Sequence, residues 1–194
     1  GLSLPARDIG LAAAMNVPWL MVRRRPRVAI LATGDEIVMP GEFLGPNQIV
    51  SSNGPALAAL VRTCGGVPVS LGVAADNPTA LKVRAAAASG ADLLITSGGA
   101  SVGEHDIVQR VLGEAGLKVD FWRVAMRPGK PLIFGHLDKI PMIGVPGNPV
   151  SALVCGVLFV RPALERLLGV DREKGPPTIA LLGSDLPAND QRQD

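Results

Sequence analysis

Short apolar runs and longer amphipathic segments alternate along most of this chain. The apolar runs predict buried strands, because strands covered on both faces read as nearly continuous Val, Leu and Ile. They lie at 27–32, 67–73, 93–96 and 119–124, and a predicted hairpin follows at 132–134 and 142–145. Helical patterns lie between them, at 5–15, 53–64, 77–89, 106–115 and 149–168. This alternation predicts a three-layer α/β/α fold with a mostly parallel sheet and right-handed crossovers.

Local signals mark where the predicted helices begin and end. Ser52 or Asn53 is a candidate cap for the second helix, and the glycine pair that starts at Gly65 is a stop signal. Pro78 occupies the first position of the next helix, where proline is tolerated. Pro162 lies inside the last helical pattern and predicts a kink there.

The chain divides into three predicted parts. Residues 1–22 are predicted to form a lead-in helix and a connector, and the arginine-rich stretch 23–26 is typical of solvated surface. Residues 23–170 contain the strands and helices of the α/β domain. Residues 171–194 are predicted to be a linker and the start of a truncated C-terminal β domain.

Composition narrows the class of protein. Hydrophobic residues make up 47% of the 194 residues, aromatic residues only 3%, and the net charge is +2. These values give no support to nucleic-acid binding, and no apolar run approaches the ~18 residues of a membrane span. No signal peptide is apparent, although Gly1 is not expected to be the natural start. Cys64 and Cys155 lie in apolar contexts that favour reduced, buried thiols, so we expect a cytoplasmic enzyme.

The most informative segment reads TSGGASVGEHD and spans residues 96–106, after an apolar strand and before a predicted helix. Its small residues leave backbone N–H groups that can face an anion: Ser97, Gly98, Gly99, Ser101 and Gly103. Glu104 and Asp106 would repel a phosphate unless a cation lies between, so the segment suggests a phosphate ligand with a divalent metal. The residues alone also fit a plain strand-to-helix turn with Asp106 near the helix N-cap.

Three further segments favour the ligand site. TGDE (33–36) follows the first strand, MRPGKP (126–131) is a rigid turn with two cations, and VPGNPVS (145–151) again joins a strand to a helix. In an α/β protein the loops after strand carboxyl ends converge on one edge of the sheet, where ligands bind. The sequence therefore predicts one phosphate-and-metal site at that edge.

TGDE, SSN, TSGGASVGEHD, MRPGKP and GVPGNPVSA, in this order, resemble the molybdopterin-binding domain of the MoeA/gephyrin E-domain family. Members of that family are molybdopterin molybdotransferases of molybdenum cofactor biosynthesis. The resemblance runs from about residue 27 to 169. Weaker likenesses at 4–17 and 183–190 correspond to the helix before this domain and to the opening of the family's C-terminal β domain. Residues 23–170 are thus expected to be the molybdopterin-binding domain.

The resemblance implies an activity and its partners. The intact enzyme would insert molybdate into adenylylated molybdopterin, with Mg²⁺-dependent release of AMP and attack by water on phosphorus. It would work in the cytoplasm as a homodimer, in contact with other cofactor-biosynthesis proteins, and without nucleic acid or membrane. As a fragment, this chain is expected to bind ligand without completing the reaction.

The resemblance also implies site residues. Asp106, Glu36 and Lys130 are the expected catalytic residues, and Asp106 and Glu36 are the expected Mg²⁺ ligands. The expected substrate-binding residues are Thr33, Gly34, Asp35, Ser52, Asn53, Ser97, Gly98, Gly99, Ser101, Gly103, Glu104, Arg127, Gly129, Pro146, Gly147, Asn148 and Ser151. Two positions depart from the family: Arg127 is often lysine in relatives, and Ser51 is often an acid.

Other functions on the same fold stay open. A molybdopterin adenylyltransferase usually reads TGGTG where this chain reads SGGASVGEHD, and a CinA-like nucleotide hydrolase diverges at the GVPGNP block. A gephyrin-like scaffold module is the alternative that is not an enzyme. Outside the motifs, His136 is expected in the hairpin turn, exposed, and without a role.

Overall fold

The computed structural model describes residues 3–98, 113–114, 116–122 and 124–170, and the single residues 179, 181 and 183. Its elements are α1 (Ala6–Ala14), β1 (Arg27–Thr33), β2 (Ile37–Val38), β3 (Ile49–Val50), α2 (Asn53–Thr63), β4 (Val67–Ala74), α3 (Pro78–Ala86), β5 (Leu93–Ser97), β6 (Leu117–Trp122), β7 (Ile133–Leu137), β8 (Ile140–Val145), α5 (Pro149–Cys155), the π-helical η1 (Gly156–Val160) and α6 (Arg161–Leu167). Among the helices described, none has the length and apolar character that a membrane span requires.

Six strands form the main sheet, in the order β4-β1-β5-β8-β7-β6. The first four run parallel to one another, and β7 and β6 continue the sheet in antiparallel pairs. β2 and β3 form a separate parallel pair. The predicted mostly parallel sheet is confirmed, with the hairpin β7–β8 joining its parallel part to its antiparallel edge.

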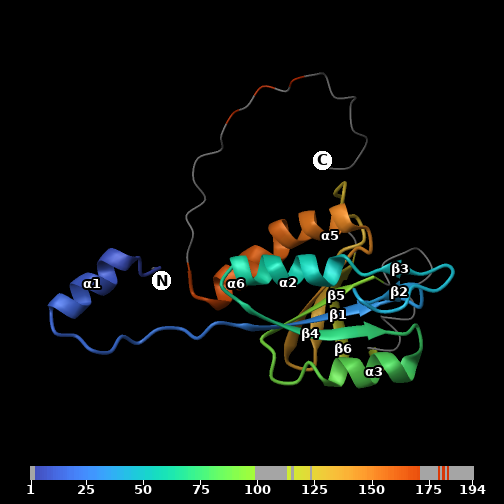
Figure 1. The fold of residues 1–194 in the computed structure, drawn as a ribbon, viewed down its shortest axis with the longest axis horizontal. Helices are drawn as coiled ribbons and strands as arrows, with labels where there is room; N and C mark the ends of the chain where they lie inside the picture. The colour runs from blue at the N-terminus through green and yellow to red at the C-terminus, as the bar shows by residue number, and fades with distance from the viewer. Residues whose placement is uncertain are drawn as a thin grey trace.

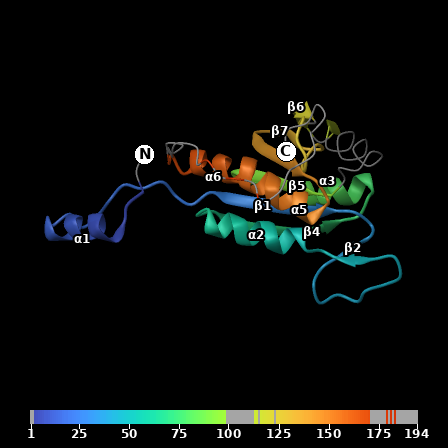
Figure 2. The ribbon, with the colours of Figure 1, turned by 90° about the horizontal axis from the view of Figure 1, so that it is seen from above.

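Helices cover both faces of the main sheet. α2, α5 and α6 lie on one face and α3 on the other (Figures 1 and 2). Val28 and Ile30 of β1 pack in the cluster that contains Leu57 of α2. Ala29 and Leu31 pack in the cluster on the α3 face. Because successive side chains of a strand point to opposite faces, a strand between two helical layers must be apolar at every position, and this confirms the three-layer prediction.

The edge of the sheet corrects one expectation. His136 lies within β7, half-buried, and the turn of the hairpin is formed by Asp138 and Lys139. The Nδ1 atom of His136 lies 2.9 Å from a carboxylate oxygen of Asp120 on β6. The sequence placed His136 in the turn because the polar residues after Phe134 interrupt the apolar run, whereas strand pairing continues through them.

The predicted helix 149–168 is one continuous helical stretch with an irregular centre. α5 is followed by the π-helical turn η1, and Pro162 comes directly after it, in the first turn of α6. Proline has no N–H to donate to the carbonyl four residues earlier, so a change of hydrogen-bond register near Pro162 is expected. Gly156 begins η1 and packs against Leu60, where a Cβ would lie 2.6 Å from that side chain.

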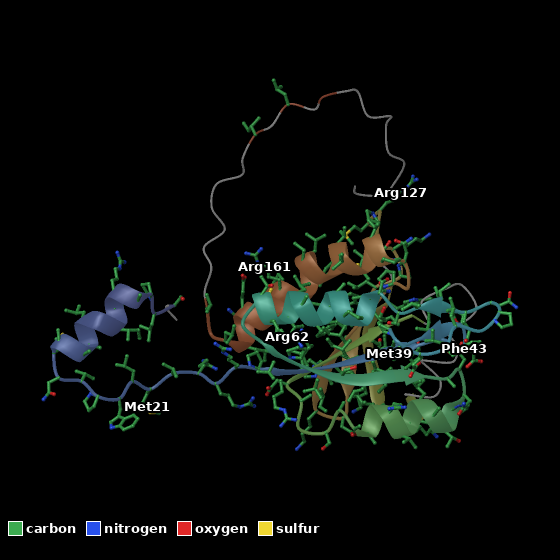
Figure 3. The ribbon with its side chains drawn as sticks, in the orientation of Figure 1. Met21, Met39, Phe43, Arg62, Arg127 and Arg161 are labelled. Carbon is green, nitrogen blue, oxygen red and sulfur yellow. The ribbon has the colours of Figure 1, made fainter. Side chains whose placement is uncertain are left out.

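The segment before β1 extends away from the sheet (Figure 1). None of the residues of α1, all of which are described, is buried, and the Trp19 side chain is 88% exposed. Met21, labelled in Figure 3, is also fully exposed. The connector is attached by Arg24, whose guanidinium donates two hydrogen bonds to Asp92, at 2.7 and 2.6 Å. Most of the predicted connector is therefore solvated, but Arg24 fixes its end.

Arg24 gives the fold a testable pH dependence. Its hydrogen bond lowers the pKa of Asp92 below the ordinary value of 3.8, helped by a hydrogen bond from the backbone N–H of Arg27. A carboxyl whose pKa is lowered by folding stabilises the fold above its unfolded-state pKa, and this stabilisation is lost as the pH falls through the folded-state pKa. Asp92→Asn should therefore lower the thermal unfolding midpoint near neutral pH, and the difference should shrink below pH 3.8.

Thermal unfolding followed by circular dichroism from about pH 7 to about pH 2 measures this difference. Asp8→Asn is the control, because Asp8 lies on α1, none of whose residues is buried. A difference between parent and Asp92→Asn that stays constant over the whole pH range would contradict the assigned role of Asp92.

Candidate functional site

The carboxyl ends of β1, β5 and β8 open into a cavity of about 590 Å³. Ligands of open α/β sheets bind at this edge, and the volume is within the range of small-molecule sites. β2 and β3 lie beyond the end of β1 and form one side of the cavity (Figure 1). The described residues that line it are Ala32, Thr33, Glu36, Ile37, Ile49, Val50, Ser51, Ser52, Asn53, Ser97, Gly98, Pro131, Pro146, Gly147, Asn148, Pro149 and Ser151.

Two buried hydroxyls lie at the strand ends. Strand register places Ala32 of β1 opposite Ser97 of β5, so Thr33 extends one residue beyond that pair. Thr33 is 2% exposed and Ser97 is 3% exposed. Within the part of the chain that the structure describes, the Thr33 hydroxyl has no hydrogen-bond partner. A buried hydroxyl without a partner is costly, by about 1–3 kcal/mol, so Thr33 can gain a hydrogen bond from a ligand in the cavity.

Asn53, at the start of α2, holds two other segments in place. Its Nδ2 donates to Ser97 Oγ at 2.9 Å and to the carbonyl oxygen of Gly147 at 2.7 Å. The amide group offers two N–H donors, so one side chain satisfies both acceptors. Asn53 therefore connects the start of α2, the end of β5 and the loop after β8.

The loop after β8 is shaped by its own cap. Asn148 is the N-cap of α5, and its Oδ1 accepts hydrogen bonds from the backbone N–H of Ser151 at 3.1 Å and from the Ser151 hydroxyl at 3.3 Å. Pro149 follows at a position that needs no donor. The asparagine–proline pair thus fixes where the loop ends, and Asn148, Pro149 and Ser151 face the cavity.

Gly98, directly after β5, allows the backbone there to approach the end of β1. Its φ of +96° is one that residues with a side chain rarely adopt, and a Cβ there would collide with the carbonyl oxygen of Thr33. On its other side, the Cα of Gly98 lies close to Gly147. Glycine at this position is therefore required by the geometry of the cavity floor.

Three carboxyl groups lie near the ends of β1 and β4. Asp35 accepts a hydrogen bond from the backbone N–H of Asp76 at 2.9 Å. Partial burial, with the negative charges of Asp35 and Glu36, raises the pKa of Asp76. Glu36 is the one charged side chain among the described residues that line the cavity. No cluster of three His, Cys, Asp or Glu residues within the described chain is arranged to hold a metal ion.

The structure brings together many of the residues expected from the sequence. Those that line the cavity are Thr33, Glu36, Ser52, Asn53, Ser97, Gly98, Pro146, Gly147, Asn148 and Ser151. Those that lie outside the described residues are Gly99, Ser101, Gly103, Glu104 and Asp106. Gly34 and Asp35 are described and adjoin the lining without forming part of it.

The predicted cation loop lies at the rim of the cavity. Arg127 and Lys130 are exposed and do not belong to the described lining, and Figure 3 shows Arg127 beside α5. Gly129 is buried against Met126 and Cys155, where a Cβ would collide with the Met126 side chain. Only Pro131 of this loop reaches the cavity. The loop is thus fixed to α5, while both cations extend into solvent.

Sequence reasoning missed one side of the cavity. Ile37 of β2 and Ile49 and Val50 of β3 line it, although these two-residue strands carry no detectable periodicity. Ser51, set aside because it departs from the family, is 5% exposed and also lines the cavity. The remaining unpredicted lining residues are Ala32, Pro131 and Pro149. Ser51 and Pro149 could have been predicted as lining residues, because each comes shortly after the end of a strand.

Comparison with known proteins places this cavity in a family. A family described as "Probable molybdopterin binding domain" matches residues 29–166, which include all the strand ends that surround the cavity. The chain belongs to this family. The resemblance noted in the sequence is thereby confirmed.

Individual relatives agree with this assignment. A molybdopterin molybdenumtransferase of Nostoc sp. is 42% identical over 186 residues, which are 94% of this chain and 43% of the relative. One from Haemophilus influenzae is 38% identical over 185 residues, 95% of this chain and 46% of the relative. The solved structure of a molybdopterin biosynthesis MoeA protein from Pyrococcus horikoshii is 38% identical with a TM-score of 0.76, covering 84% of this chain and 41% of that protein. The chain thus spans less than half the length of these relatives.

The Asn53 amide predicts a stability effect within the domain. Asn53→Ala removes the two hydrogen bonds that connect α2 with Ser97 and Gly147, so unfolding should become easier by about 1–2 kcal/mol. Urea denaturation followed by fluorescence or circular dichroism measures the change. Thr63→Ala is the matched control at the other end of α2, since its hydroxyl donates to the carbonyl oxygen of Ala59 in the same helix. Equal free energies of unfolding for the two variants would show that Asn53 does not connect these segments.

Proposed function

We propose that this chain is the ligand-binding part of a molybdopterin molybdenumtransferase, which inserts molybdate into adenylylated molybdopterin and releases AMP. The observation that carries the proposal is the convergence of three family motifs on one cavity, through Thr33, Ser97 and Gly147. The relatives that match more than nine-tenths of this chain bear that name. Because they are more than twice as long as the matched region, other segments would complete the reaction site.

The described lining supports binding of a phosphate by neutral donors. Thr33, Ser97 and Ser151, which carry hydroxyls, line the cavity, and glycine at 98 and 147 lets the backbone come close to a ligand. Neutral donors orient a phosphate without cancelling its charge, so a cation is required as well. In the proposed reaction water attacks phosphorus, and the role of these residues is to hold and orient the phosphate.

Mg²⁺ is the proposed cation. It prefers oxygen ligands and usually takes one or two carboxylates together with phosphate oxygens. Glu36 offers such a carboxylate to the cavity, and Asp106 is the second proposed ligand. The bound ion would neutralise negative charge that develops on the phosphate.

Arg127 and Lys130 are the proposed oxyanion-binding residues. Both are exposed at the rim, on a loop whose next residue, Pro131, lines the cavity. Arginine offers a planar fork of N–H donors and lysine a compact positive charge, and both suit molybdate. Molybdate would therefore bind at the edge of the phosphate site rather than within it.

The proposed setting is the cytoplasm, with a homodimer as the working assembly and with contacts to other cofactor-biosynthesis proteins. Cys64 and Cys155 are free, as is usual in a reducing compartment. Burial raises the pKa of the Cys155 thiol to about 11, so it is unreactive at neutral pH. An adenylyltransferase, a nucleotide hydrolase and a scaffold module are the alternative functions on this fold, and a nucleotide turnover assay would separate the two enzymes from the proposed function.

The metal assignment predicts the behaviour of two acids. Glu36→Gln and Asp106→Ala should each weaken AMP binding in the presence of Mg²⁺ by roughly ten- to a hundredfold, because a charge-assisted contact contributes about 1.5–3 kcal/mol. Calorimetric titration with AMP, with and without Mg²⁺, measures the effect. Asp120→Asn, an acid at the far edge of the sheet, should bind as the parent does. An unchanged Mg²⁺ dependence in both Glu36→Gln and Asp106→Ala would rule out their role as metal ligands.

The oxyanion assignment predicts a separate effect. Lys130→Ala should raise the molybdate concentration required by the full-length enzyme by roughly ten- to a hundredfold, from the same charge-assisted contribution. Binding of adenylylated molybdopterin should change less, and higher ionic strength should weaken molybdate binding. Lys139→Ala, on the hairpin turn, is the control. Loss of pterin nucleotide binding with an unchanged molybdate requirement would show that Lys130 serves the phosphate instead.

A further inference from the structure

One side of the cavity differs in chemistry from its floor. Ile37 of β2 and Ile49 of β3 are register partners in the parallel pair, so their side chains lie on the same face. Both line the cavity. In the next pair, Val38 is 8% exposed and does not belong to the lining, whereas its partner Val50 is 46% exposed and also lines the cavity. Ile37 and Ile49 thus present adjacent aliphatic side chains to the cavity, which we call the isoleucine platform.

The isoleucine platform is held firmly and yet left uncovered. The backbone N–H of Ile49 donates to the Glu36 carbonyl at 2.7 Å, and that of Ser51 donates to the Val38 carbonyl at 2.8 Å. Ser51 is itself buried next to the start of α2. Despite this anchoring, the Ile49 side chain is 59% exposed. An anchored aliphatic surface that faces a cavity rather than a core is suited to contact an apolar part of a ligand.

In contrast to the isoleucine platform, the strand ends that form the cavity floor are polar. Thr33, Asn53 and Ser97 supply hydroxyl and amide groups there, and the Thr33 hydroxyl is buried without a partner among the described residues. One cavity therefore combines a polar floor with an aliphatic side. A ligand that fits both carries a polar, anionic group and a flat apolar surface on the same molecule.

We propose that the isoleucine platform binds one face of a planar heteroaromatic ring of the ligand, while the polar floor binds its phosphate. This inference rests on the proposed function and names the part of the ligand that β2 and β3 recognise. Both halves of an adenylylated pterin contain such a ring, the adenine and the pterin, and aliphatic side chains contact either by burial of apolar area. The ring edges remain free to form hydrogen bonds.

The loop between β2 and β3 supplies a matched control. It projects from the body of the domain (Figure 2), and Phe43 lies on it with 90% of its surface exposed. Phe43 is labelled in Figure 3 and does not belong to the described cavity lining. Phe43→Ser removes a large apolar side chain from the same segment without changing the isoleucine platform. Ile49→Ser and Ile49→Leu change the platform itself, at an exposed position where the fold does not depend on the side chain.

Three probes test the inference by calorimetric titration of the parent chain and these variants: AMP, ribose 5-phosphate, and a pterin with a phosphorylated side chain. The parent should bind at least one ring-bearing probe more tightly than ribose 5-phosphate. Ile49→Ser should weaken that binding about five- to tenfold, as expected for the apolar area that one ring face loses. Ribose 5-phosphate binding should stay unchanged, Ile49→Leu should weaken ring binding less than Ile49→Ser because it keeps the apolar area, and Phe43→Ser should behave as the parent.

The probe that responds identifies the ring. A loss confined to AMP assigns the isoleucine platform to adenine, and a loss confined to the pterin assigns it to the pterin. Unchanged binding of both ring-bearing probes to Ile49→Ser would overturn the inference and leave the proposed function intact. An equal loss for ribose 5-phosphate would overturn it as well. Failure of the parent to bind any of the three probes would overturn the proposed function and this inference together.

Discussion

The two N–H groups of the Asn53 amide join three chain segments on which the cavity depends. They reach Ser97 at the end of β5 and the carbonyl of Gly147 after β8, residues 44 and 94 positions away in the sequence. A carboxylate or an aliphatic side chain at this position would have no donor for either acceptor. The location of the cavity floor therefore depends on α2 beginning at Asn53, which in turn depends on the apolar face that packs α2 on the sheet.

The sheet supplies the rigid frame for this arrangement. β1 and β5 are buried at nearly every position, so their carboxyl ends are fixed by packing on both faces. Gly98 then lets the chain after β5 lie against the end of β1. Because the sheet fixes the position of these loops, the type of ligand that they bind depends on the side chains that they carry. On this frame the domain carries hydroxyl and amide groups at the strand ends and aliphatic groups on the side formed by β2 and β3.

The sequence predicted the parts of the fold in which local and tertiary signals agree. The continuous apolar runs of β1 and β5 gave strands nearly at their observed bounds. The pair Asn77–Pro78 predicted the start of α3. Asn77 Oδ1 accepts a hydrogen bond from the backbone N–H of Ala80 at 2.8 Å. Each of these signals lies within a few residues of the feature that it predicts, which is why sequence alone was sufficient.

Features that depend on distant contacts could not be predicted in this way. β2 and β3 pair over only two residues each, so neither shows a period. The direction of Arg127 and Lys130 follows from the packing of Gly129 against Cys155, which no local pattern records. His136 stays in β7 because β6 pairs alongside it. In the site, the motifs indicated which loops converge. The aliphatic side of the cavity, formed by β2 and β3, could be recognised only from the three-dimensional structure.

The central claim is that a phosphate-bearing ligand binds at the strand-end cavity. NMR titration of the isotopically labelled chain with AMP and Mg²⁺ tests this claim most directly. The account predicts saturable shifts of the backbone amide signals of Thr33, Asn53, Gly98 and Gly147, which line the cavity, with the signals of β6 unchanged. Shifts confined to β6, β7 or α1, with the four cavity signals unmoved, would contradict it.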